Sequence, residues 1–366
     1  MSDITDKQTT RPVILVVVWT RPEVIKCQNM ITGLSRRADI QLITATTGQH
    51  RDITPPILAE LPLKTTTAAE IESDVGGLAQ RLARSLERLT ELISRHDIST
   101  VVAQGDTLSA YTAALAAFLT PGTRLLHIEA GVRSTRTSEP YPEEGFRRMI
   151  TNMTDNHICF EQQAVANLIR EGVPYNRIQL THHPAETYLP KVFAKRKLIP
   201  TRDMVLITFH RRERRADRLA KLTNILNLLR QARPATTIKV VKHPKVDLRP
   251  MAEMVEGLIQ LDPMSHVAFL NELAQAGCLV TDSAGAVEES TRMLVPTLSF
   301  RQAVENRSLG PGPILHTEQV DVASRFIVHH LERRMPQRDF AGIQDEPTRE
   351  RSRLEDCVLR AAKVQR

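Results

Sequence analysis

Short, continuous apolar runs alternate along this chain with longer segments whose apolar residues recur every three or four positions. In the first half, the apolar runs cover residues 13–19, 41–48, 100–106, 124–130, 157–160 and 177–182. Such runs are typical of strands buried in a parallel sheet, and the periodic segments between them, such as residues 74–96, predict amphipathic helices. The alternation therefore predicts a doubly wound α/β domain.

The same alternation begins again near residues 198–203. Apolar runs predict strands at 204–210, 238–243, 267–270, 278–283 and 296–300, and the intervening patterns predict helices at 217–232 and 283–294. We therefore predict two Rossmann-like, doubly wound domains that face a central cleft, as in the GT-B architecture. The predicted domains are residues 1–184 and 185–346, and a last helix within 347–366 is expected to pack back on the first domain.

Composition narrows the class of protein. The chain has 366 residues, of which 41% are hydrophobic and 25% are charged, as in soluble globular proteins. It has no apolar run long enough to span a membrane, and its polar first ten residues do not resemble a signal peptide. Four widely separated cysteines without metal-site spacing indicate reduced, buried thiols, so we expect a cytoplasmic protein.

Charge indicates the kind of partner. The net charge is +7, which favours an anionic ligand such as a nucleotide sugar, a nucleic acid or an acidic surface. Aromatic residues make up only 4% of the chain, so stacking platforms for single-stranded nucleic acid are scarce. The basic run at 210–218 is equally well read as a solvated helix face. We therefore expect a small anionic ligand, with no nucleic-acid partner.

Three carboxylates follow predicted strands in the first domain. Asp106 and Glu129 stand at the ends of two buried runs, and Glu143 opens the next helix after a proline-rich loop. Groups at the carboxyl ends of parallel strands point into the ligand crevice, where paired carboxyl groups can move protons. In the alternative interpretation, Asp106 and Glu143 cap helices and Glu129 is a buried structural acid.

Anion-binding features occur at the corresponding strand ends. Arg21 and Lys26 lie at the start of the first helix, where an anion would also meet helix amides. In the second domain, His210 follows a strand, and Ser283 precedes a helix that carries Glu289, whose carboxylate could accept two ribose hydroxyls. Taken alone, a Ser-x-Gly turn before a helix is more often a simple helix cap. Neither domain has a G-x-G-x-x-G after its first strand, which argues against a nicotinamide cofactor.

In this order, these motifs resemble the UDP-N-acetylglucosamine 2-epimerase family over nearly the whole chain. The matching segments are TRPEVIK (20–26), GQHRD (48–52), GDT (105–107), HIEAGVRS (127–134), YPEEGFRR (141–148), HRRE (210–213), TDSAGAVEE (281–289) and VENR (304–307). The resemblance implies two Rossmann-like domains of the GT-B type, no redox cofactor and no metal. It also implies a UDP-GlcNAc substrate, and we expect a homodimer.

The family's reaction removes the proton on carbon 2 of the sugar while UDP leaves carbon 1. The intermediate is 2-acetamidoglucal. UDP then adds back and carbon 2 is reprotonated on the other face, which gives UDP-N-acetylmannosamine. Alternatives are a hydrolysing epimerase that releases free N-acetylmannosamine, a related GT-B glycosyltransferase, and a non-catalytic nucleotide-sugar sensor.

The resemblance also implies roles for individual residues. The catalytic residues would be Asp106, Glu129, Glu143 and His210. The substrate-binding residues would be Arg21, Lys26, Arg147, His243, Phe269, Ser283, Ala284, Gly285, Glu289 and Arg307. A second nucleotide-sugar site, typical of the non-hydrolysing bacterial type, would use Gln49, His50, Arg84 and Arg211 together with Lys26. A polar loop without a ligand is the alternative for Gln49 and His50.

Several positions depart from the family pattern. Trp19, Phe209 and Ala284 stand where glycines are usual, and His182 and His183 replace a glycine and an asparagine. The histidine pair has no third ligand at a suitable spacing, so no metal site is expected. We expect Trp19 and Phe209 to line the crevice and narrow the second nucleotide-sugar pocket. The alternative is that both side chains turn into the core and leave the diphosphate site intact.

Overall fold

The chain forms two compact units, which the computed structural model places at Met1–Pro184 with Pro347–Arg366, and at Ala185–Glu346. We refer to them as unit 1 and unit 2, and each is described by itself. The structure describes residues 11–46, 68–70, 76–136, 139–193, 201–209, 215–242, 249–300, 309–333 and 353–363. Within these ranges no helix is long and apolar enough to cross a membrane.

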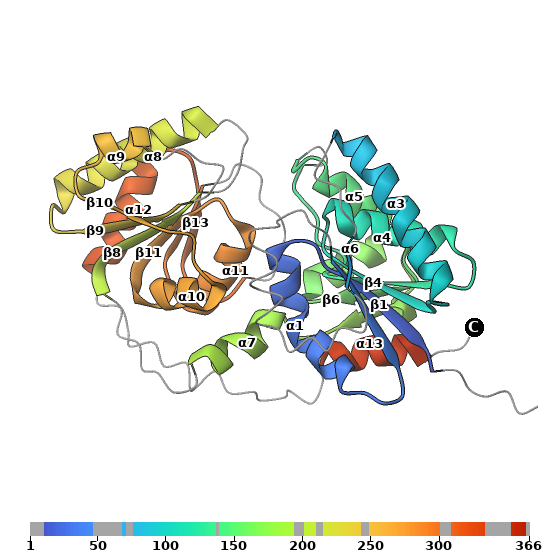
Figure 1. Cartoon of the computed structure of the whole chain (residues 1–366). Coiled ribbons are helices and arrows are strands. Elements are labelled where there is room, and N and C mark those ends of the chain that lie inside the picture. Colours follow the sequence, from blue (N-terminus) through green and yellow to red (C-terminus); the bar gives the residue numbers. More distant parts are fainter. Residues whose placement is uncertain are drawn as a thin grey trace, which may run out of the picture. The chain divides into compact units, whose positions relative to one another are not determined.

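Unit 1 is a parallel sheet with the strand order β3-β2-β1-β4-β5-β6-β7 (Figure 1). Its strands are β1 (Val13–Val17), β2 (Gln41–Thr46), β3 (Ala68–Glu70), β4 (Thr100–Gln104), β5 (Arg124–Ile128), β6 (Asn156–Cys159) and β7 (Ile178–Leu180). Its helices are α1 (Arg21–Ser35), α3 (Leu78–Arg95), α4 (Leu108–Leu119), α5 (Glu143–Met153), α6 (Gln162–Arg170), a short 3-10 turn η2 (Tyr175–Arg177) and α13 (Leu354–Lys363).

Helices cover both faces of this sheet. One core lies between the sheet and α1 with α13, and the other lies between the sheet and α3, α4 and α5 (Figure 1). The last helix, α13, packs against α1 and contributes Cys357 and Val358 to the first core. Residues far apart in the sequence therefore complete a single unit.

Unit 2 repeats the plan with a parallel sheet in the order β10-β9-β8-β11-β12-β13. Its strands are β8 (Thr201–Thr208), β9 (Thr237–Val241), β10 (Leu258–Leu261), β11 (Ala276–Thr281), β12 (Thr297–Ser299) and β13 (Ile314–His316). Its helices are α7 (Pro184–Phe193), α8 (Arg215–Ala232), α9 (Arg249–Met254), α10 (His266–Gln275), α11 (Ala284–Arg292) and α12 (Val320–Glu332). The predicted fold class of two Rossmann-like, doubly wound α/β domains is confirmed.

In both units the chain winds outward from a central strand and then returns to its other side. The reversal falls between β1 and β4 in unit 1 and between β8 and β11 in unit 2. Ligands of open α/β sheets bind outside the carboxyl ends of the strands at such a switch point. The segments that follow β1, β4, β8 and β11 are therefore the places to look for a site.

The predicted position of Trp19 and Phe209, the two bulky residues that stand where the family usually has glycines, was wrong. Trp19 is 1% exposed and Phe209 is 2% exposed, and each belongs to the core of its unit. Alternate residues of a strand face the same side of the sheet, and Trp19 continues the face of Leu15 and Val17. Phe209 packs on Phe300 with ring centroids 6.3 Å apart. Both side chains turn into the core, as in the alternative, and the state of the diphosphate site stays a prediction.

One predicted strand was also wrong. Residues 267–270 lie in helix α10, whose N-cap Ser265 accepts a hydrogen bond from the amide of Ala268 at 3.2 Å. The buried positions Leu270, Leu273 and Ala274 recur with helical spacing. A short apolar run does not distinguish a strand from the buried face of a helix, and the serine cap decides it here.

Candidate active site

Acidic and basic side chains meet at the carboxyl edge of the unit 1 sheet. Glu129 follows β5 directly, and its Oε2 accepts a hydrogen bond from Lys26 Nζ at 2.8 Å. Gln104, the last residue of β4, donates its side-chain amide to the same oxygen. Lys26 and Glu129 are 8% and 7% exposed. Burying an ion pair costs desolvation free energy, so this pair is better explained by function than by stability.

The backbone of Glu129 adds to that argument. Its φ is +65°, in the left-handed region that residues with a side chain seldom adopt. Such conformations are held only where the surrounding structure fixes them, and they concentrate at functional sites. The next residue but one, Gly131, also has a positive φ, and a Cβ there would lie 2.3 Å from the carbonyl oxygen of Ala164. The loop after β5 is therefore tightly constrained.

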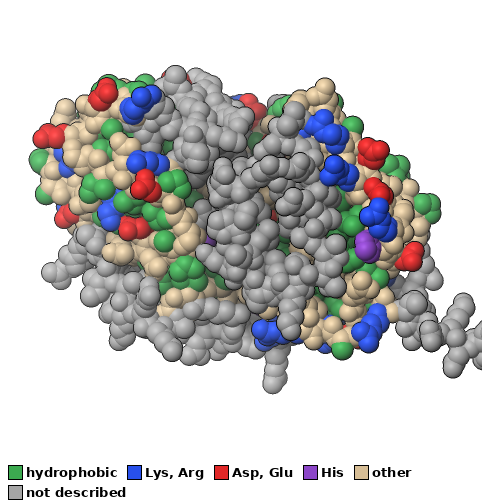
Figure 2. All heavy atoms as spheres, viewed as in Figure 1, with side chains coloured by type: hydrophobic (Ala, Val, Ile, Leu, Met, Phe, Trp, Pro, Cys, Tyr) green, Lys and Arg blue, Asp and Glu red, His purple; other side chains and the backbone are tan. Residues whose placement is uncertain are grey.

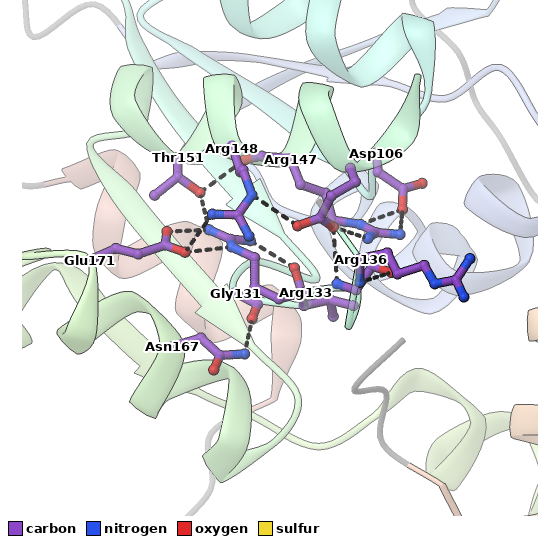
Figure 3. Close-up of polar contacts among 12 residues, drawn as sticks. Asp106, Gly131, Arg133, Arg136, Arg147, Arg148, Thr151, Asn167 and Glu171 are labelled. Atoms are coloured by element: carbon purple, nitrogen blue, oxygen red, sulfur yellow. Dashed lines mark hydrogen bonds and ion pairs between the residues drawn. The ribbon is translucent and has the colours of Figure 1, made fainter. Parts of the chain in front are cut away.

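A second charged group surrounds Asp106. Arg147 of α5 donates Nε to Asp106 Oδ2 at 2.7 Å, and its Nη1 donates to Glu144 Oε2 at 2.6 Å (Figure 3). Glu144 is fully buried and also accepts bonds from Arg148 Nε and the amide of Ser134, each at 3.0 Å. Arg147 is therefore held between two carboxylates, and it orients the one at the end of β4.

Neither Asp106 nor Glu143 is the cap of its helix. The cap of α4 is Thr107, whose hydroxyl accepts from the amide of Ala110 at 3.2 Å. Glu143 is the first residue of α5 and lies half-buried. Because it stands four residues before Arg147, it lies on the same face of α5 as the arginine that contacts Asp106. The structure therefore brings Asp106, Arg147 and Glu143 to one edge of the sheet.

Arg133 braces the loop that carries Glu129. Its Nε and Nη2 donate to the two carboxylate oxygens of Glu171 at 2.7 and 2.6 Å, and these bonds lower the pKa of Glu171 (Figure 3). Asn167 of α6 donates to the carbonyl oxygen of Gly131 at 2.9 Å. These contacts explain the glycine and arginine of the motif HIEAGVRS as supports for the loop.

Glu23 is a buried acid that the sequence analysis did not single out. It is 2% exposed, and it accepts hydrogen bonds from the amides of Trp19 and Thr20 and from the hydroxyls of Thr107 and Ser109. Burial raises the pKa of Glu23, and the four hydrogen bonds oppose that rise. Glu23 therefore ties the turn after β1 to the turn that holds Asp106. The T-x-x-E spacing of a capping box was the signal for it.

The binding features of unit 2 gather around α11. Ser283 caps this helix by accepting from the amide of Ala286 at 3.3 Å, and Ala284 and Gly285 form its first turn. Within the described part of the chain, a Cβ built on Gly285 would meet no atom within 4 Å. Glu289 lies one turn further along the same helix face as Gly285 and is 8% exposed.

Glu289 contacts residues from two other elements. Its Oε1 accepts hydrogen bonds from the hydroxyl of Tyr188 at 2.5 Å and from Nε2 of His266 at 2.6 Å. Phe269, expected near the uracil, lies half-buried on α10, one turn beyond His266. Nothing in the sequence pattern indicated Tyr188 or His266, because their contact with Glu289 depends on how three separate helices pack.

Several predicted site residues lie outside the described residues. They are His210, Arg211, Gln49, His50, His243 and Arg307. Arg21 begins α1, but its side chain is likewise outside the description, and Arg84 lies exposed on α3. Of the predicted second nucleotide-sugar site, only Lys26 and Arg84 are described, and Lys26 is paired with Glu129. That second site stays a prediction.

The histidines at the departure from the family pattern are described. His183 is buried, with its ring edge-on to Phe160 at 5.2 Å between centroids. Pro184 begins α7. Among the described residues, no group of three or more His, Cys, Asp or Glu side chains is arranged to hold a metal ion.

Charged side chains of both signs are interspersed over the described surface on the face drawn in Figure 2. Ion pairs between exposed side chains, such as Arg37 with Asp39 and Lys363 with Asp39, join charges of opposite sign. The positive excess of the chain is therefore not gathered into one patch on the described part of that face.

Comparison with known proteins places these features in a family. The profile of the family described as UDP-N-acetylglucosamine 2-epimerase matches residues 32–312. Proteins named UDP-N-acetylglucosamine 2-epimerase are similar in Salmonella borreze (26% identical over 311 residues, 80% of this chain and 82% of that protein) and in Bacillus subtilis (27% over 302 residues, 80% and 79%). The fold is similar to the crystal structure of Methanocaldococcus jannaschii UDP-GlcNAc 2-epimerase in complex with UDP-GlcNAc and UDP. That match has a TM-score of 0.75 and 21% identity, and covers 92% of this chain and 98% of that one.

Proposed function

The chain belongs to the UDP-N-acetylglucosamine 2-epimerase family, and from that membership we propose that it interconverts UDP-GlcNAc and UDP-N-acetylmannosamine. The observation that carries the proposal is the charged edge of unit 1. Asp106 and Glu129 stand at the ends of neighbouring strands, and each pairs with a buried basic side chain. Glu143 lies on α5, the helix that also carries the arginine paired with Asp106. Inversion at carbon 2 needs proton transfer on both faces of the sugar, and separate carboxyl groups can supply it.

The proposed reaction balances without a redox step. A carboxylate takes the proton from carbon 2, the electron pair forms the double bond between carbons 1 and 2, and the bond from carbon 1 to the diphosphate oxygen breaks. The products are 2-acetamidoglucal and UDP. The reverse addition, with a proton delivered to the opposite face of carbon 2, gives the epimer.

Lys26, Gln104 and Arg147 fix the carboxylates for this work. Two donors on Oε2 of Glu129, from Lys26 and Gln104, fix the orientation of its carboxyl group. Arg147 holds Asp106 in the same way from α5. Glu143 and one of these carboxylates would then serve opposite faces of the sugar, and His210 would stabilise or protonate the departing diphosphate.

Unit 2 would hold the nucleotide. The capped N-terminus of α11, with Ser283, Ala284 and Gly285, offers backbone amides to a diphosphate, and open space at Gly285 would let it approach closely. Glu289 would accept the ribose hydroxyls, and Phe269 would lie near the uracil. Arg21, His243 and Arg307 would add positive charge or donors. The cleft between the units, the homodimer and the cytoplasmic location stay predictions.

The test is a product analysis. Purified protein is incubated with UDP-GlcNAc, and the sugar nucleotides and free sugars are separated and identified by NMR. The proposal expects an equilibrium mixture of UDP-GlcNAc and UDP-N-acetylmannosamine. Release of free N-acetylmannosamine with stoichiometric UDP would replace it with the hydrolysing reaction, and binding of UDP-GlcNAc without any product would replace it with a sensor.

A further inference from the structure

Three side chains from three helices meet in unit 2. Tyr188 of α7 and His266 of α10 both donate to the same oxygen of Glu289, Oε1, at 2.5 and 2.6 Å. Tyr188 and Glu289 are 6% and 8% exposed, and the rings of Tyr188 and His266 pack edge to face with centroids 5.4 Å apart. The three side chains therefore form a packed cluster in which each limits the movement of the others.

The two bonds use one half of the Glu289 carboxylate. A carboxylate oxygen has two lone pairs, and the tyrosine and the histidine occupy both on Oε1. Burial, with Glu289 close by, raises the pKa of Tyr188, so its hydroxyl stays a donor. His266 must carry its hydrogen on Nε2 to donate to a carboxylate. Both donors therefore fix the rotation of the carboxylate and direct Oε2 away from themselves.

Space beside Gly285 lies one helical turn before this carboxylate on α11. Gly285 and Glu289 share one face of α11 and are separated by ~6 Å along the helix axis. At Gly285 a side-chain carbon would meet no atom of the described residues within 4 Å. Phe269, three residues after His266, lies on the same side of α10. The arrangement offers a fixed acceptor beside room for a ligand, with an aromatic ring on the neighbouring helix.

We propose that Tyr188 and His266 are positioning residues that orient Glu289 so that its Oε2 accepts the ribose hydroxyls of a uridine nucleotide. They thereby set the preference of the site for ribose over deoxyribose. A vicinal diol supplies two donors to an acceptor-only group, whereas a deoxyribose leaves part of that buried acceptor unsatisfied. The inference rests on the nucleotide site of the proposed function.

The test measures discrimination between nucleotides by titration calorimetry. Dissociation constants of UDP and 2′-deoxy-UDP are compared for the wild type, Tyr188→Phe, His266→Phe and His266→Gln. The wild type is expected to bind UDP about tenfold more tightly, as for loss of a hydrogen bond to a charged group. Tyr188→Phe and His266→Phe should reduce this ratio several-fold. His266→Gln, which keeps a donor at similar reach, should restore most of it.

A matched control is Tyr175→Phe, which removes a hydroxyl from a tyrosine that is 74% exposed and should leave the ratio unchanged. The ratio of the two dissociation constants is a property of the folded protein. Partial unfolding of a variant therefore lowers the amount of protein that binds but does not change this ratio. If Tyr188→Phe and His266→Phe keep the wild-type ratio, their role is only structural and the inference fails. A wild type that does not distinguish the two nucleotides overturns it as well.

These outcomes are separate from those of the product analysis. Epimerisation together with an unchanged ratio would overturn the positioning role and leave the proposed function standing. A ratio that collapses in both variants, without any epimerisation, would support the positioning role and remove the proposed reaction.

Discussion

The two units share one strand order but differ in what stands at the carboxyl ends of their central strands. In unit 1, carboxylates at the ends of β4 and β5 pair with buried cations, Arg147 and Lys26. In unit 2, the segment after β11 holds the buried Asp282 and the capping Ser283, and Glu289, further along α11, is held by a tyrosine and a histidine. The same sheet can therefore present proton-transfer groups or ligand-binding groups, because the fold fixes positions and the side chains decide the chemistry.

The largest expected effect separates these two tasks. Asp106→Asn, Glu129→Gln and Glu143→Gln should each lower kcat by ~10²-fold or more, as for loss of a general acid or base. Binding of UDP, measured by calorimetry, should change little, because we assign it to unit 2. The control is Glu91→Gln on the exposed face of α3. Near-normal rates in all three variants would make these carboxylates structural.

Much of this difference between the two units could be predicted from the sequence, because the apolar run of a strand and the acid that follows it are both local signals. Runs of apolar residues predicted most strands, and the acids that follow β4 and β5 could be assigned to a strand end. The partners could not be predicted. Lys26 and Glu129 are 103 positions apart, and Tyr188 and Glu289 are 101 apart, so their contacts exist only after the sheet and helices have assembled.

Short elements also limited what could be predicted from the sequence. The four residues of β10 are half-buried or exposed, so this strand lacks the continuous apolar run that marks a buried one. Residues 267–270 have such a run but belong to α10. Trp19 and Phe209 were assigned to the ligand side because they precede functional turns. Alternation along the strand sends them into the core instead.

The next effect concerns stability and should appear in both units. Trp19→Ala and Phe209→Ala should each lower the free energy of unfolding by roughly 3–5 kcal/mol, the cost of emptying a buried aromatic site. Urea denaturation followed by circular dichroism measures this loss. Phe118→Ala, at a phenylalanine that is 64% exposed, is the matched control and should change little. If the loss in free energy of unfolding is as small as that of the control, the two rings do not lie in the core and would instead face the ligand side.

A smaller effect concerns the response of unit 1 to acid. Burial lowers the pKa of His127 to about 4 and that of His157 to about 3, from an ordinary 6.5. Between pH 6.5 and about 4 the unfolded chain therefore binds more protons than the folded one, so the free energy of unfolding falls as pH falls. Each histidine should contribute a slope of about 1.4 kcal/mol per pH unit in that window.

Trp19 is the only tryptophan of the chain and lies in unit 1, so its fluorescence reports this transition. Urea unfolding at several pH values is compared between the wild type and His157→Leu, which removes one titrating group. The variant should show the shallower dependence on pH. Identical slopes would mean that His157 does not titrate differently in the folded and unfolded states.

The central claim is that the charged edge of unit 1 moves a proton at carbon 2 of the sugar. The most direct measurement incubates the protein with UDP-GlcNAc in deuterated water and follows the carbon-2 proton of both sugar nucleotides by NMR. The account predicts that deuterium enters carbon 2 of the product and of the recovered substrate. Turnover that leaves the original hydrogen at carbon 2 would contradict it.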